Sequence, residues 1–438
     1  MDQYVVYKFG GASVKDADAI KNVGNIIEAL PSHRLMIVVS AMGKTTNALE
    51  EVVQMTLSDS SKAISAVGEI WSESRMVMRE LELDSDHLTQ KLDQIIESKL
   101  KYIADVGADT NKPPYDYLYD QIVILGELIS SLILSAYLTQ KRNLNLAWLD
   151  AREIIRTNST HREGQVNWNE TSWLFQKTVI PTFDQHQFVL TQGFIASDDH
   201  QNSITLGREG SDYTAAVCSY CLDAEYMAIW KDVPGVLTAD PRLFENVSLL
   251  DRLSYQEAIE MTYYGAKVIH PKTIKPLQNK NIPLRVNSFI EPDQPGTLIG
   301  DFNEISYPPV VVVKKNQRLL SISTRDLSFV AEHHLSRLFT LFDKHRIRVN
   351  LMRNTAISFT VCMTDNPNRI NRLLEEIGHE FNIVNELDLE LVTIRHYQEP
   401  IVEELKNGKI VLFEERIPKT VQLVLKDVPI LKRKKEEG

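Results

Sequence analysis

A lysine and two glycines near the N-terminus are the first residues whose types and spacing could do chemistry. Lys8 directly follows the apolar run Tyr4–Tyr7, and Gly10 and Gly11 come two and three residues later. Glycine lets backbone N–H groups approach an anion closely, and a lysine beside such a turn adds positive charge. The stretch therefore indicates phosphate binding. An ordinary tight turn with a surface lysine has the same residue pattern, so this stretch alone leaves both interpretations open.

A second polar segment follows the apolar run Met36–Val39. Its hydroxyl and amide groups, Ser40 and Asn47 among them, could contact a ligand. Gly43-Lys44-Thr45 resembles the end of a P-loop, but the first glycine of that motif would fall at Val38, inside the apolar run. We therefore interpret this segment as a ligand-contacting loop and not as a P-loop.

Charged residues recur next to later apolar runs. Glu127 lies between two such runs, where a carboxylate either satisfies backbone N–H groups at a helix start or faces a cleft as a ligand group. Position alone favours the capping role. Arg208 and Asp212 belong to the glycine-bearing turn Gly207–Asp212, which opens a predicted helix. Lys231 and Asp232 follow another apolar run.

The elements that must position these residues alternate between apolar strands and amphipathic helices, which predicts a parallel sheet covered on both faces. Ligands in such sheets bind at the carboxyl ends of the strands, so we expect the turns named above to converge. The segment 59–119 is mostly helical in pattern, with an apolar stripe of Trp71, Met76, Met78 and Leu81 predicted to be core. The predicted strands are Tyr4–Tyr7, Met36–Val39, Phe188–Leu190, Ser203–Leu206 and Tyr226–Trp230, and the predicted helices include Ala17–Leu30, Leu128–Thr139 and Tyr213–Leu222.

Length and composition limit the class of protein. The chain has 438 residues, which is too long for one core and predicts two or three domains. A formal net charge of −11 argues against nucleic acid or an anionic membrane as the main partner. We identify no apolar run of transmembrane length and no signal peptide, so we predict a cytoplasmic protein.

Two cysteines, Cys218 and Cys221, have the spacing of some metal and redox sites. They lie in the predicted helix Ser211–Leu222, and no second pair of Cys or His residues nearby would complete a zinc site. We interpret them as packing residues.

The glycine turn and the later blocks together resemble one family. Lys8-Phe9-Gly10-Gly11-x-Ser13-Val14 is similar to the opening signature of aspartate kinases, in the amino acid kinase superfamily. Many similar blocks in one order are far more specific than any single motif. The resemblance implies an α/β fold, a three-layer αβα sandwich with a mainly parallel sheet, over residues 1–297. The further blocks are Gly126-Glu127-Leu128, Asp150-x-Arg152, Arg156-Thr157-Asn158, Thr191-Gln192-Gly193-Phe194, Thr205–Ala215, Asp232–Val236, Asp240-Pro241-Arg242 and Tyr264–Pro271.

The resemblance also implies a reaction. Aspartate kinases use ATP with Mg²⁺ to phosphorylate the side-chain carboxylate of L-aspartate, the first step of lysine, threonine and methionine biosynthesis. A carboxylate with a pKa of about 3.9 is ionised at neutral pH, so the site needs positive charge and alignment and no general base. By resemblance, Lys8 stabilises the transferring phosphoryl group and Lys267 reaches the nucleotide phosphates. Asp212 orients Lys8 or the metal, whose ligands are not assigned.

The resemblance assigns the substrate's α-groups to two charged residues. Arg208 can hold the α-carboxylate through its planar guanidinium, and Glu127 can accept from the α-ammonium. A salt bridge between Glu127 and Arg208 in the empty protein would not contradict these roles. The residues expected to complete the pocket are Ser40, Asn47, Phe194 and Ser211.

The nucleotide side departs from the family pattern. This chain has Trp230-Lys231-Asp232 where Trp-Thr-Asp is common, and Leu237 where an aromatic residue is usual. Lys231 could contact phosphate or lie in solvent, and Leu237 would cover the adenine or ribose by apolar contact. The residues expected to bind the nucleotide are Lys8, Gly10, Gly11, Ser13, Lys231, Asp232, Leu237, Arg242 and Lys267.

Prolines and a glycine interrupt all periodicity in the segment 291–309, which we interpret as a domain boundary. Beyond it the pattern is βαββαβ over about 317–394, which is the ferredoxin-like order. Because this segment follows a part of the chain that resembles aspartate kinases, it resembles an ACT regulatory unit. We expect the regulatory region to cover residues 310–438. The remaining residues are too few for a second complete unit, so we expect a reduced one, and a homodimer through this region. The basic run Lys432–Lys435 is interpreted as a solvated tail.

Two functional questions follow from the resemblance. A catalytically silent, amino-acid-sensing kinase relative is the alternative function, but retention of Lys8, Glu127, Arg208, Asp212 and Lys267 argues against it. We also expect insensitivity to lysine. Lysine-sensitive relatives carry a Gly-Phe-Leu segment where this chain has His333-His334-Leu335. They carry an aspartate where this chain has Asn350, and hydroxyl residues where it has Arg353 and Asn354.

Overall fold

The computed structural model describes residues 3–30, 33–83, 85–266, 269–302, 305–326 and 328–428. The basic run Lys432–Lys435 therefore lies outside the described residues. The chain divides into two compact units, and we describe each by itself. The first unit contains Met1–Val236, Leu249–Ile259 and Ile269–Ile305, and the second contains Leu237–Ser248, Glu260–Val268 and Ser306–Gly438.

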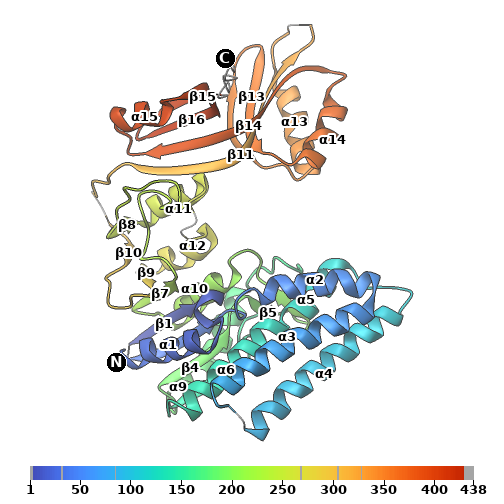
Figure 1. Ribbon diagram of the computed structural model, residues 1–438, viewed down its shortest axis with the longest axis vertical. Coiled ribbons are helices and arrows are strands. Elements are labelled where there is room, and N and C mark those ends of the chain that lie inside the picture. The colour runs from blue at the N-terminus through green and yellow to red at the C-terminus, as the bar shows by residue number, and fades with distance from the viewer. Residues whose placement is uncertain are drawn as a thin grey trace, which may run out of the picture. The chain divides into compact units, whose positions relative to one another are not determined.

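An eight-stranded sheet forms the centre of the first unit, in the order β3-β4-β2-β1-β7-β9-β10-β8 (Figure 1). All neighbours are parallel except β9 and β10. The central strands are apolar and buried, as expected of a parallel sheet covered on both faces, so the predicted fold class is confirmed. The strands are β1 (Tyr4–Phe9), β2 (Arg34–Val39), β3 (Leu146–Trp148), β4 (Phe188–Gln192), β7 (Tyr226–Lys231), β8 (Arg252–Ser254), β9 (Leu284–Ser288) and β10 (Thr297–Gly300).

Helices pack around this sheet and against one another, with α2, α3 and α4 forming a helical layer together with α5 and α6. A 3₁₀ turn spans Gly11–Val14, and a π-helical segment spans Phe175–Val179. The α-helices are α1 (Ala17–Glu28), α2 (Thr45–Ser58), α3 (Ser60–Glu80), α4 (Asp86–Ala108), α5 (Tyr115–Val123), α6 (Leu125–Gln140), α7 (Ala151–Ile154), α8 (Trp168–Leu174), α9 (Ile180–Phe183), α10 (Gly210–Leu222), α11 (Tyr255–Tyr264) and α12 (Pro271–Asn279).

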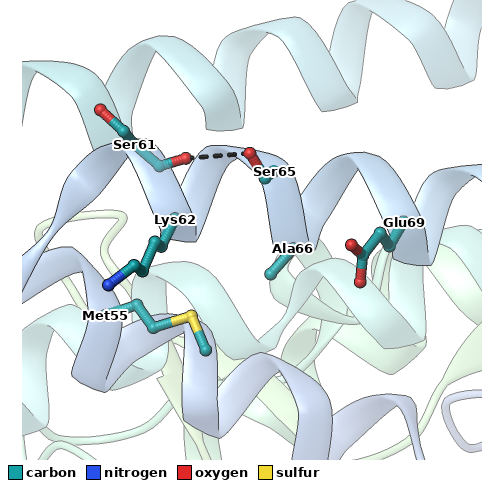
Figure 2. Close-up of a pocket in the computed structure, with 6 residues that line it drawn as sticks. All are labelled: Met55, Ser61, Lys62, Ser65, Ala66 and Glu69. Carbon is teal, nitrogen blue, oxygen red and sulfur yellow. Dashed lines mark hydrogen bonds between the residues drawn. The ribbon is translucent and has the colours of Figure 1, made fainter.

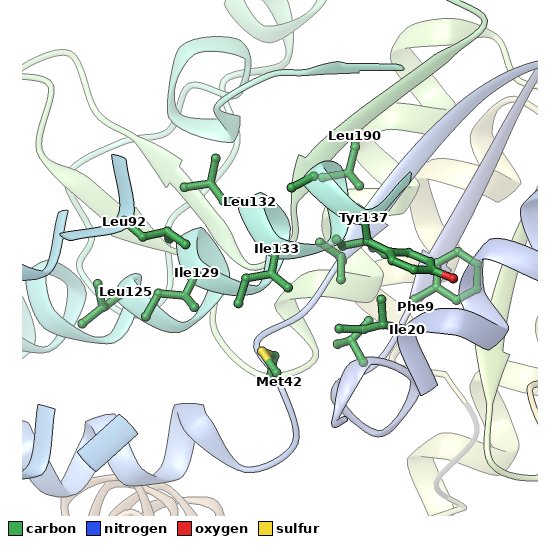
Figure 3. Close-up of a cluster of buried hydrophobic side chains, with 14 of the residues drawn as sticks. Phe9, Ile20, Met42, Leu92, Leu125, Ile129, Leu132, Ile133, Tyr137 and Leu190 are labelled. Carbon is green, nitrogen blue, oxygen red and sulfur yellow. The ribbon is translucent and has the colours of Figure 1, made fainter. Parts of the chain in front are cut away.

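Helix α6 is apolar on almost every side and forms the middle of the core. Figure 3 shows Leu125, Ile129, Ile133 and Tyr137 of α6 among side chains from the sheet and from α1 and α4. By length and composition, the stretch Tyr115–Gln140 is long and apolar enough to cross a membrane, so the prediction that no apolar run has transmembrane length was wrong. In its most apolar window, 89% of the residues are buried inside the protein, which is the pattern of a core helix.

Two predictions about the first unit were wrong. Ser203–Leu206 does not join the parallel sheet, because β6 (Ser203–Thr205) pairs antiparallel with β5 (Ile195–Ser197) in a separate two-stranded sheet. Both strands are buried, and burial alone does not distinguish a local hairpin from a sheet strand. Met76 is 52% exposed, although Trp71, Met78 and Leu81 of the same predicted stripe are buried.

The second unit contains a six-stranded antiparallel sheet in the order β12-β13-β11-β14-β16-β15 (Figure 1). The predicted βαββαβ order is confirmed, and one helix and two strands follow it, as expected for a reduced second repeat. The elements are β11 (Val310–Thr324), α13 (Glu332–Lys344), β12 (Val349–Asn354), β13 (Ser358–Thr364), α14 (Pro367–Ile377), β14 (Phe381–Arg395), α15 (Glu399–Lys406), β15 (Lys409–Ile417) and β16 (Thr420–Asp427).

Strands β11 and β14 belong to both halves of this sheet. The sequence pattern predicted shorter strands, Leu319–Ser323 and Leu387–Ile394, at these two places. The observed strands pair from Val310↔Arg395 to Thr324↔Phe381, with register shifts near Gln317. One half of the pair packs with α13 and α14, and the other half packs with α15. The segment α15–β15–β16 therefore packs on the same two strands, β11 and β14, that belong to the βαββαβ pattern.

Gly126 supplies a test of how closely α6 approaches the loop after β2. A Cβ at Gly126 would lie 2.9 Å from Ala41 Cβ and 3.2 Å from Leu49 Cδ1. We expect Gly126→Ala to destabilise the protein by about 1–3 kcal/mol and to lower its melting temperature in scanning calorimetry. Gly68→Ala is the matched control, because Gly68 lies in α3 with open space around its Cβ position. This control should stabilise by roughly 0.5–1 kcal/mol, and equal effects of both changes would contradict the packing argument.

Candidate active site

The carboxyl ends of four neighbouring parallel strands, β4, β2, β1 and β7, meet at one edge of the sheet. Backbone hydrogen bonds join the segments that follow them: Ser40 N donates to Phe9 O at 3.1 Å, and Gly193 N donates to Val39 O at 2.8 Å. The predicted convergence of these turns is therefore confirmed for Gly10–Gly11, Ser40, Gly193 and the end of β7.

The glycine turn after β1 is held against the loop after β2. Gly43 N donates to Gly11 O at 2.9 Å, and a Cβ at Gly11 would lie only 2.8 Å from Gly43 O. Only glycine allows two backbones to approach this closely. Ser13, in the 3₁₀ turn that follows, is buried and donates from Oγ to Trp230 O at 3.4 Å, so it ties this turn to β7.

The structure changes one detail of the phosphate-binding hypothesis. Helix α1 does not begin at the glycines: the 3₁₀ turn intervenes, and Asp16 caps α1 by accepting from Ala19 N at 2.8 Å. A carboxylate already occupies the position that an anion would take at this helix N-terminus. The dipole of α1 is therefore not what the glycine turn offers a phosphate. Ser13 N already donates to Gly10 O at 2.9 Å, so any backbone donors for a phosphate must come from the other N–H groups of this turn.

A cluster of three charged residues lies at this edge, of which Lys8 and Asp212 are buried and Lys231 is partly exposed. Lys8 Nζ is 2.6 Å from Asp212 Oδ1, and Lys231 Nζ is 3.8 Å from Asp212 Oδ2. Burial raises the pKa of the Asp212 carboxyl, but the nearby ammonium groups of Lys8 and Lys231 outweigh burial and hold this pKa below its usual range. The cluster therefore carries one net positive charge. A Cβ at Gly10 would lie 3.5 Å from Lys8 Nζ, so the lysine ammonium lies over the glycine turn.

Glu127 lies in the first turn of α6 and is 2% exposed. Its Oε2 has no hydrogen-bond partner among the described residues. Burial raises the pKa of Glu127 to about 8, although the N–H of Ala41 and the hydroxyl of Thr46 act in the opposite direction. An orphaned buried carboxyl oxygen is costly unless a ligand completes its contacts, which favours the ligand role over simple helix capping.

The remaining predicted substrate residues lie on two segments: Arg208 and Ser211 at the start of α10, and Ser40 and Asn47 between the end of β2 and the first turn of α2. Arg208 is exposed, and its side chain forms no hydrogen bond or ion pair with the described residues, so no Glu127–Arg208 salt bridge forms. Ser211 is buried, while Ser40 is partly buried and Asn47 is exposed in the first turn of α2.

Phe194 has a left-handed backbone, with φ +69°, which is uncommon for an aromatic residue. Two hydrogen bonds hold it there: Phe194 N donates to Thr214 Oγ1 at 2.9 Å, and Leu206 N donates to Phe194 O at 2.8 Å. Backbone strain fixed in this way is frequent at functional sites. Sequence patterns carry no signal for this strain.

The predicted nucleotide residues are divided between the two units. Lys231 and Asp232 lie at the end of β7 in the first unit, where Asp232 is exposed. Leu237 and Arg242 belong to the second unit, where Arg242 pairs with Asp240 at 2.6 Å. Lys267 lies outside the described residues. The pairing of Lys231 with Asp212 was not predicted, because Lys231 stands where the family commonly has Thr and the resemblance therefore gives it no partner.

Two other features of the described chain do not coincide with this edge of the sheet. An open pocket of about 380 Å³ lies between α2 and α3 and is lined by Met55, Ser61, Lys62, Ser65, Ala66 and Glu69, none of which we predicted to bind a ligand (Figure 2). Cys218 and Cys221 lie buried in α10, and burial raises the pKa of Cys221 to about 11.

Comparison with known proteins agrees with this geometry. Residues 3–288 match the amino acid kinase family. Lysine-sensitive aspartokinase 3 of Escherichia coli (strain K12) is 30% identical over 367 residues, which cover 83% of this chain and 79% of that protein. Chloroplastic aspartokinase 2 of Arabidopsis thaliana is 30% identical over 392 residues, which cover 87% and 70% of the two chains.

Solved structures give the same result. E. coli aspartokinase III in complex with lysine and aspartate superposes with a TM-score of 0.81 at 26% identity, covering 96% of this chain and 95% of that one. Its complex with aspartate and ADP gives a TM-score of 0.80 at 26% identity, covering 97% and 96%. The sequence and structural matches span both units, and the chain therefore belongs to the amino acid kinase family, within its aspartokinases.

Proposed function

We propose that the chain transfers the γ-phosphoryl group of ATP to the side-chain carboxylate of L-aspartate where β1, β2, β4 and β7 end. The observation that carries this assignment is the Lys8–Asp212 pair, which fixes a lysine ammonium over the glycine turn. A positive charge fixed beside backbone donors is what a phosphoryl group in transfer requires. The aspartokinase relatives support the choice of substrates.

In the proposed mechanism the protein aligns two anions and supplies charge between them. The substrate carboxylate is ionised at neutral pH and needs no base. Lys8 stabilises the transferring phosphoryl group, and Asp212 holds Lys8 in place. Lys231 adds a second ammonium on the other oxygen of Asp212, so it would contact the nucleotide phosphates from β7. We keep Lys267 in its predicted role on the nucleotide phosphates.

The α-groups of aspartate are held by opposite charges in this proposal. Glu127, with its unpartnered Oε2, accepts from the α-ammonium, and Arg208, whose guanidinium is unpaired among the described residues, binds the α-carboxylate. Ser40, Asn47, Phe194 and Ser211 complete the pocket. On the nucleotide side we retain Gly10, Gly11, Ser13, Asp232, Leu237 and Arg242.

Mg²⁺ is proposed to accompany ATP. Within the described residues no group of three Asp, Glu, His or Cys side chains could hold a metal, and both oxygens of Asp212 face lysines. Mg²⁺ commonly keeps several waters and is held by substrate phosphates with few protein ligands, which fits this donor set. Such an ion would neutralise phosphate charge, and Lys8 and Lys231 would supply the remainder.

The second unit is proposed to be regulatory. We retain a catalytic domain over 1–297 and an ACT-like region over 310–438 that forms a homodimer, and a cytoplasmic location. Large apolar side chains, including Met352 of the edge strand β12 and Ile410 of the edge strand β15, are exposed in this sheet, which supports self-association. The alternative function, a catalytically silent amino-acid sensor, predicts binding without turnover.

Activity and the role of Lys8 can be tested together. Wild-type protein should form aspartyl phosphate from ATP and aspartate, trapped with hydroxylamine, whereas a silent sensor would form none. We expect Lys8→Ala to lower kcat at least about 100-fold, because it removes the charge at the transferring group. Lys15→Ala is the control, since Lys15 lies just after the same turn with its side chain 61% exposed. Lys8→Ala leaves the buried Asp212 carboxylate without its close partner, which could itself impair folding. The double variant Lys8→Ala/Asp212→Asn removes this carboxylate charge as well, so restored folding in it would show that the unpaired charge was the cause. Retention of most activity in Lys8→Ala would make Lys8 structural.

Proton release on binding tests the role of Glu127. Because burial raises the pKa of Glu127 to about 8, the empty site holds a neutral carboxyl at pH 7. A bound ammonium favours the ionised form, so aspartate binding should release a proton near pH 7 and should tighten as the pH rises toward 8. The free protein should lose stability over the same rise, because its folded state binds the extra proton. Calorimetric titration with aspartate in buffers of different ionisation enthalpy measures the release, and Glu127→Gln should abolish it. Unchanged proton release in Glu127→Gln would refute the assignment.

Lysine is expected to be a poor effector. In the second unit, Asn350 Oδ1 already accepts from Lys314 Nζ at 3.2 Å, and its Nδ2 donates to Gln317 Oε1 at 2.8 Å. The Arg353 guanidinium lies 5.5 Å from the centre of the Phe413 ring. A cationic ligand at Asn350 would therefore meet the like charge of Lys314, and Asn350 itself offers an amide in place of a carboxylate. Titrating lysine and threonine separately into the kinase assay measures this, and strong inhibition by lysine below millimolar concentration would overturn the expectation.

A further inference from the structure

One fully buried carboxylate in the first unit has no part in the proposed mechanism. Asp120, in α5, is 0% exposed. It accepts from Thr205 Oγ1 at 2.6 Å and from Arg162 N at 3.1 Å, and it lies 2.8 Å from His161 Nδ1. Burial raises the pKa of this carboxyl, while these three groups favour its ionised form. Burying this carboxyl group is costly, and a charged acceptor binds donors more strongly than a neutral one. We therefore ask what the contacts of Asp120 with Thr205, His161 and Arg162 hold in place.

The groups around Asp120 support the turn that carries Arg208. Thr205 ends β6, three residues before Arg208. Its carbonyl accepts from Gly164 N at 3.0 Å, which joins β6 to the segment His161–Gly164. Gly207 has φ +76°, and a Cβ there would lie 3.0 Å from Arg162 O. The backbone just before Arg208 is therefore pressed against the same segment that Asp120 binds.

Helix α5 holds this segment by more than Asp120. The Arg162 guanidinium lies 3.1 Å from Asp116 Oδ1 and 4.5 Å from the centre of the Tyr119 ring. The ring of Tyr117 meets the ring of His161 edge-on at 5.1 Å. Asp120 is the fully buried member of these contacts and reaches Thr205 of β6. Gln121, its neighbour in α5, also reaches β6, because its Nε2 donates to Ser203 O at 2.9 Å.

The same helical segment carries Glu127. Only Ile124 separates α5 from α6, so Glu127 follows Asp120 by seven residues along nearly continuous helix. Both helices are buried in the core, which makes the spacing between Asp120 and Glu127 rigid. Asp120 therefore connects the helix that carries Glu127 with the turn that carries Arg208.

We propose that Asp120 is a positioning residue that sets the Arg208 turn at a fixed distance from Glu127. The proposal rests on the proposed function, in which these two residues hold the α-carboxylate and the α-ammonium of one substrate. The distance between the two groups is fixed in any α-amino acid. Asp120 thus acts on aspartate binding through Arg208 and touches neither substrate nor nucleotide.

Steady-state kinetics of matched variants test this. Asp120→Asn keeps the shape and a carbonyl acceptor but loses the charge, and Thr205→Val keeps the shape and removes the donor. Both should raise the KM for aspartate about 10- to 100-fold, as small misplacements of binding groups do, with the KM for ATP within about twofold of wild type. Thr205→Ser should restore normal kinetics. Asp93→Asn is the control, because Asp93 also joins two helices, accepting from Trp71 Nε1 at 3.1 Å, but lies outside the site.

A double-mutant cycle separates positioning from general stability. If Asp120 acts through Arg208, the effect of Asp120→Asn on the aspartate KM should largely disappear in an Arg208→Lys background. Fully additive effects would overturn the proposal, as would a normal aspartate KM in both Asp120→Asn and Thr205→Val. Equal rises in both KM values, accompanied by a lower melting temperature, would also overturn it. If Asp120→Asn does not fold, Thr205→Val decides. A wild-type protein that forms no aspartyl phosphate would refute the proposed function as well, whereas active wild type with unaffected variants refutes only the role of Asp120.

Discussion

The buried contact between Lys8, Asp212 and Lys231 is the constraint on which the active edge of the first unit depends. Lys8 and Asp212 are buried, whereas Lys231 is partly exposed. Removing two charges from water costs several kcal/mol per ion, and only close pairing offsets this cost. Pairing requires β1, β7 and the start of α10 to meet, which the order β2-β1-β7 in the sheet provides. Asp212 is shared by two lysines, and the ammonium group of one of them, Lys8, lies beside the glycine turn. The requirement for a stable core and the requirement for an anion-binding edge are met by the same three residues.

The sequence identified the strands and turns of the first unit well, and the reason is physical. Buried parallel strands such as Met36–Val39 are continuous apolar runs, and the glycines after them are needed where backbones touch, as at Gly11 and Gly43. Ser203–Leu206 was assigned to the wrong sheet because pairing partners are chosen by tertiary packing and not by the run itself. The lengths of β11 and β14 were underestimated for a related reason, since Lys314 and Lys315 interrupt the apolar pattern of β11 without ending the strand.

The residues of the candidate site stay a prediction, whereas one contact among them, that of Asp212 with Lys8, was predicted and is observed. Family resemblance supplied Lys8, Glu127, Arg208 and Asp212, and residue chemistry made their roles sensible. No sequence pattern shows that Lys231 shares Asp212 with Lys8, that Asp16 closes the start of α1, or that an oxygen of Glu127 lacks a partner. These are properties of three-dimensional proximity and burial, which arise only when distant segments pack together.

The shared strands β11 and β14 have a consequence for how the second unit can form during synthesis. The run Val310–Val313 consists of four valines, and among the strands it pairs only with the end of β14, near Val392–Arg395. Until the ribosome has made those residues, this run is an apolar strand with a free edge, the kind of segment that associates between chains. The later half of β11 is different, because it can pair with β13 about thirty residues earlier in synthesis. The nascent chain therefore exposes an aggregation-prone strand edge for the time needed to add some eighty residues. Rapid synthesis of β14 shortens this exposure.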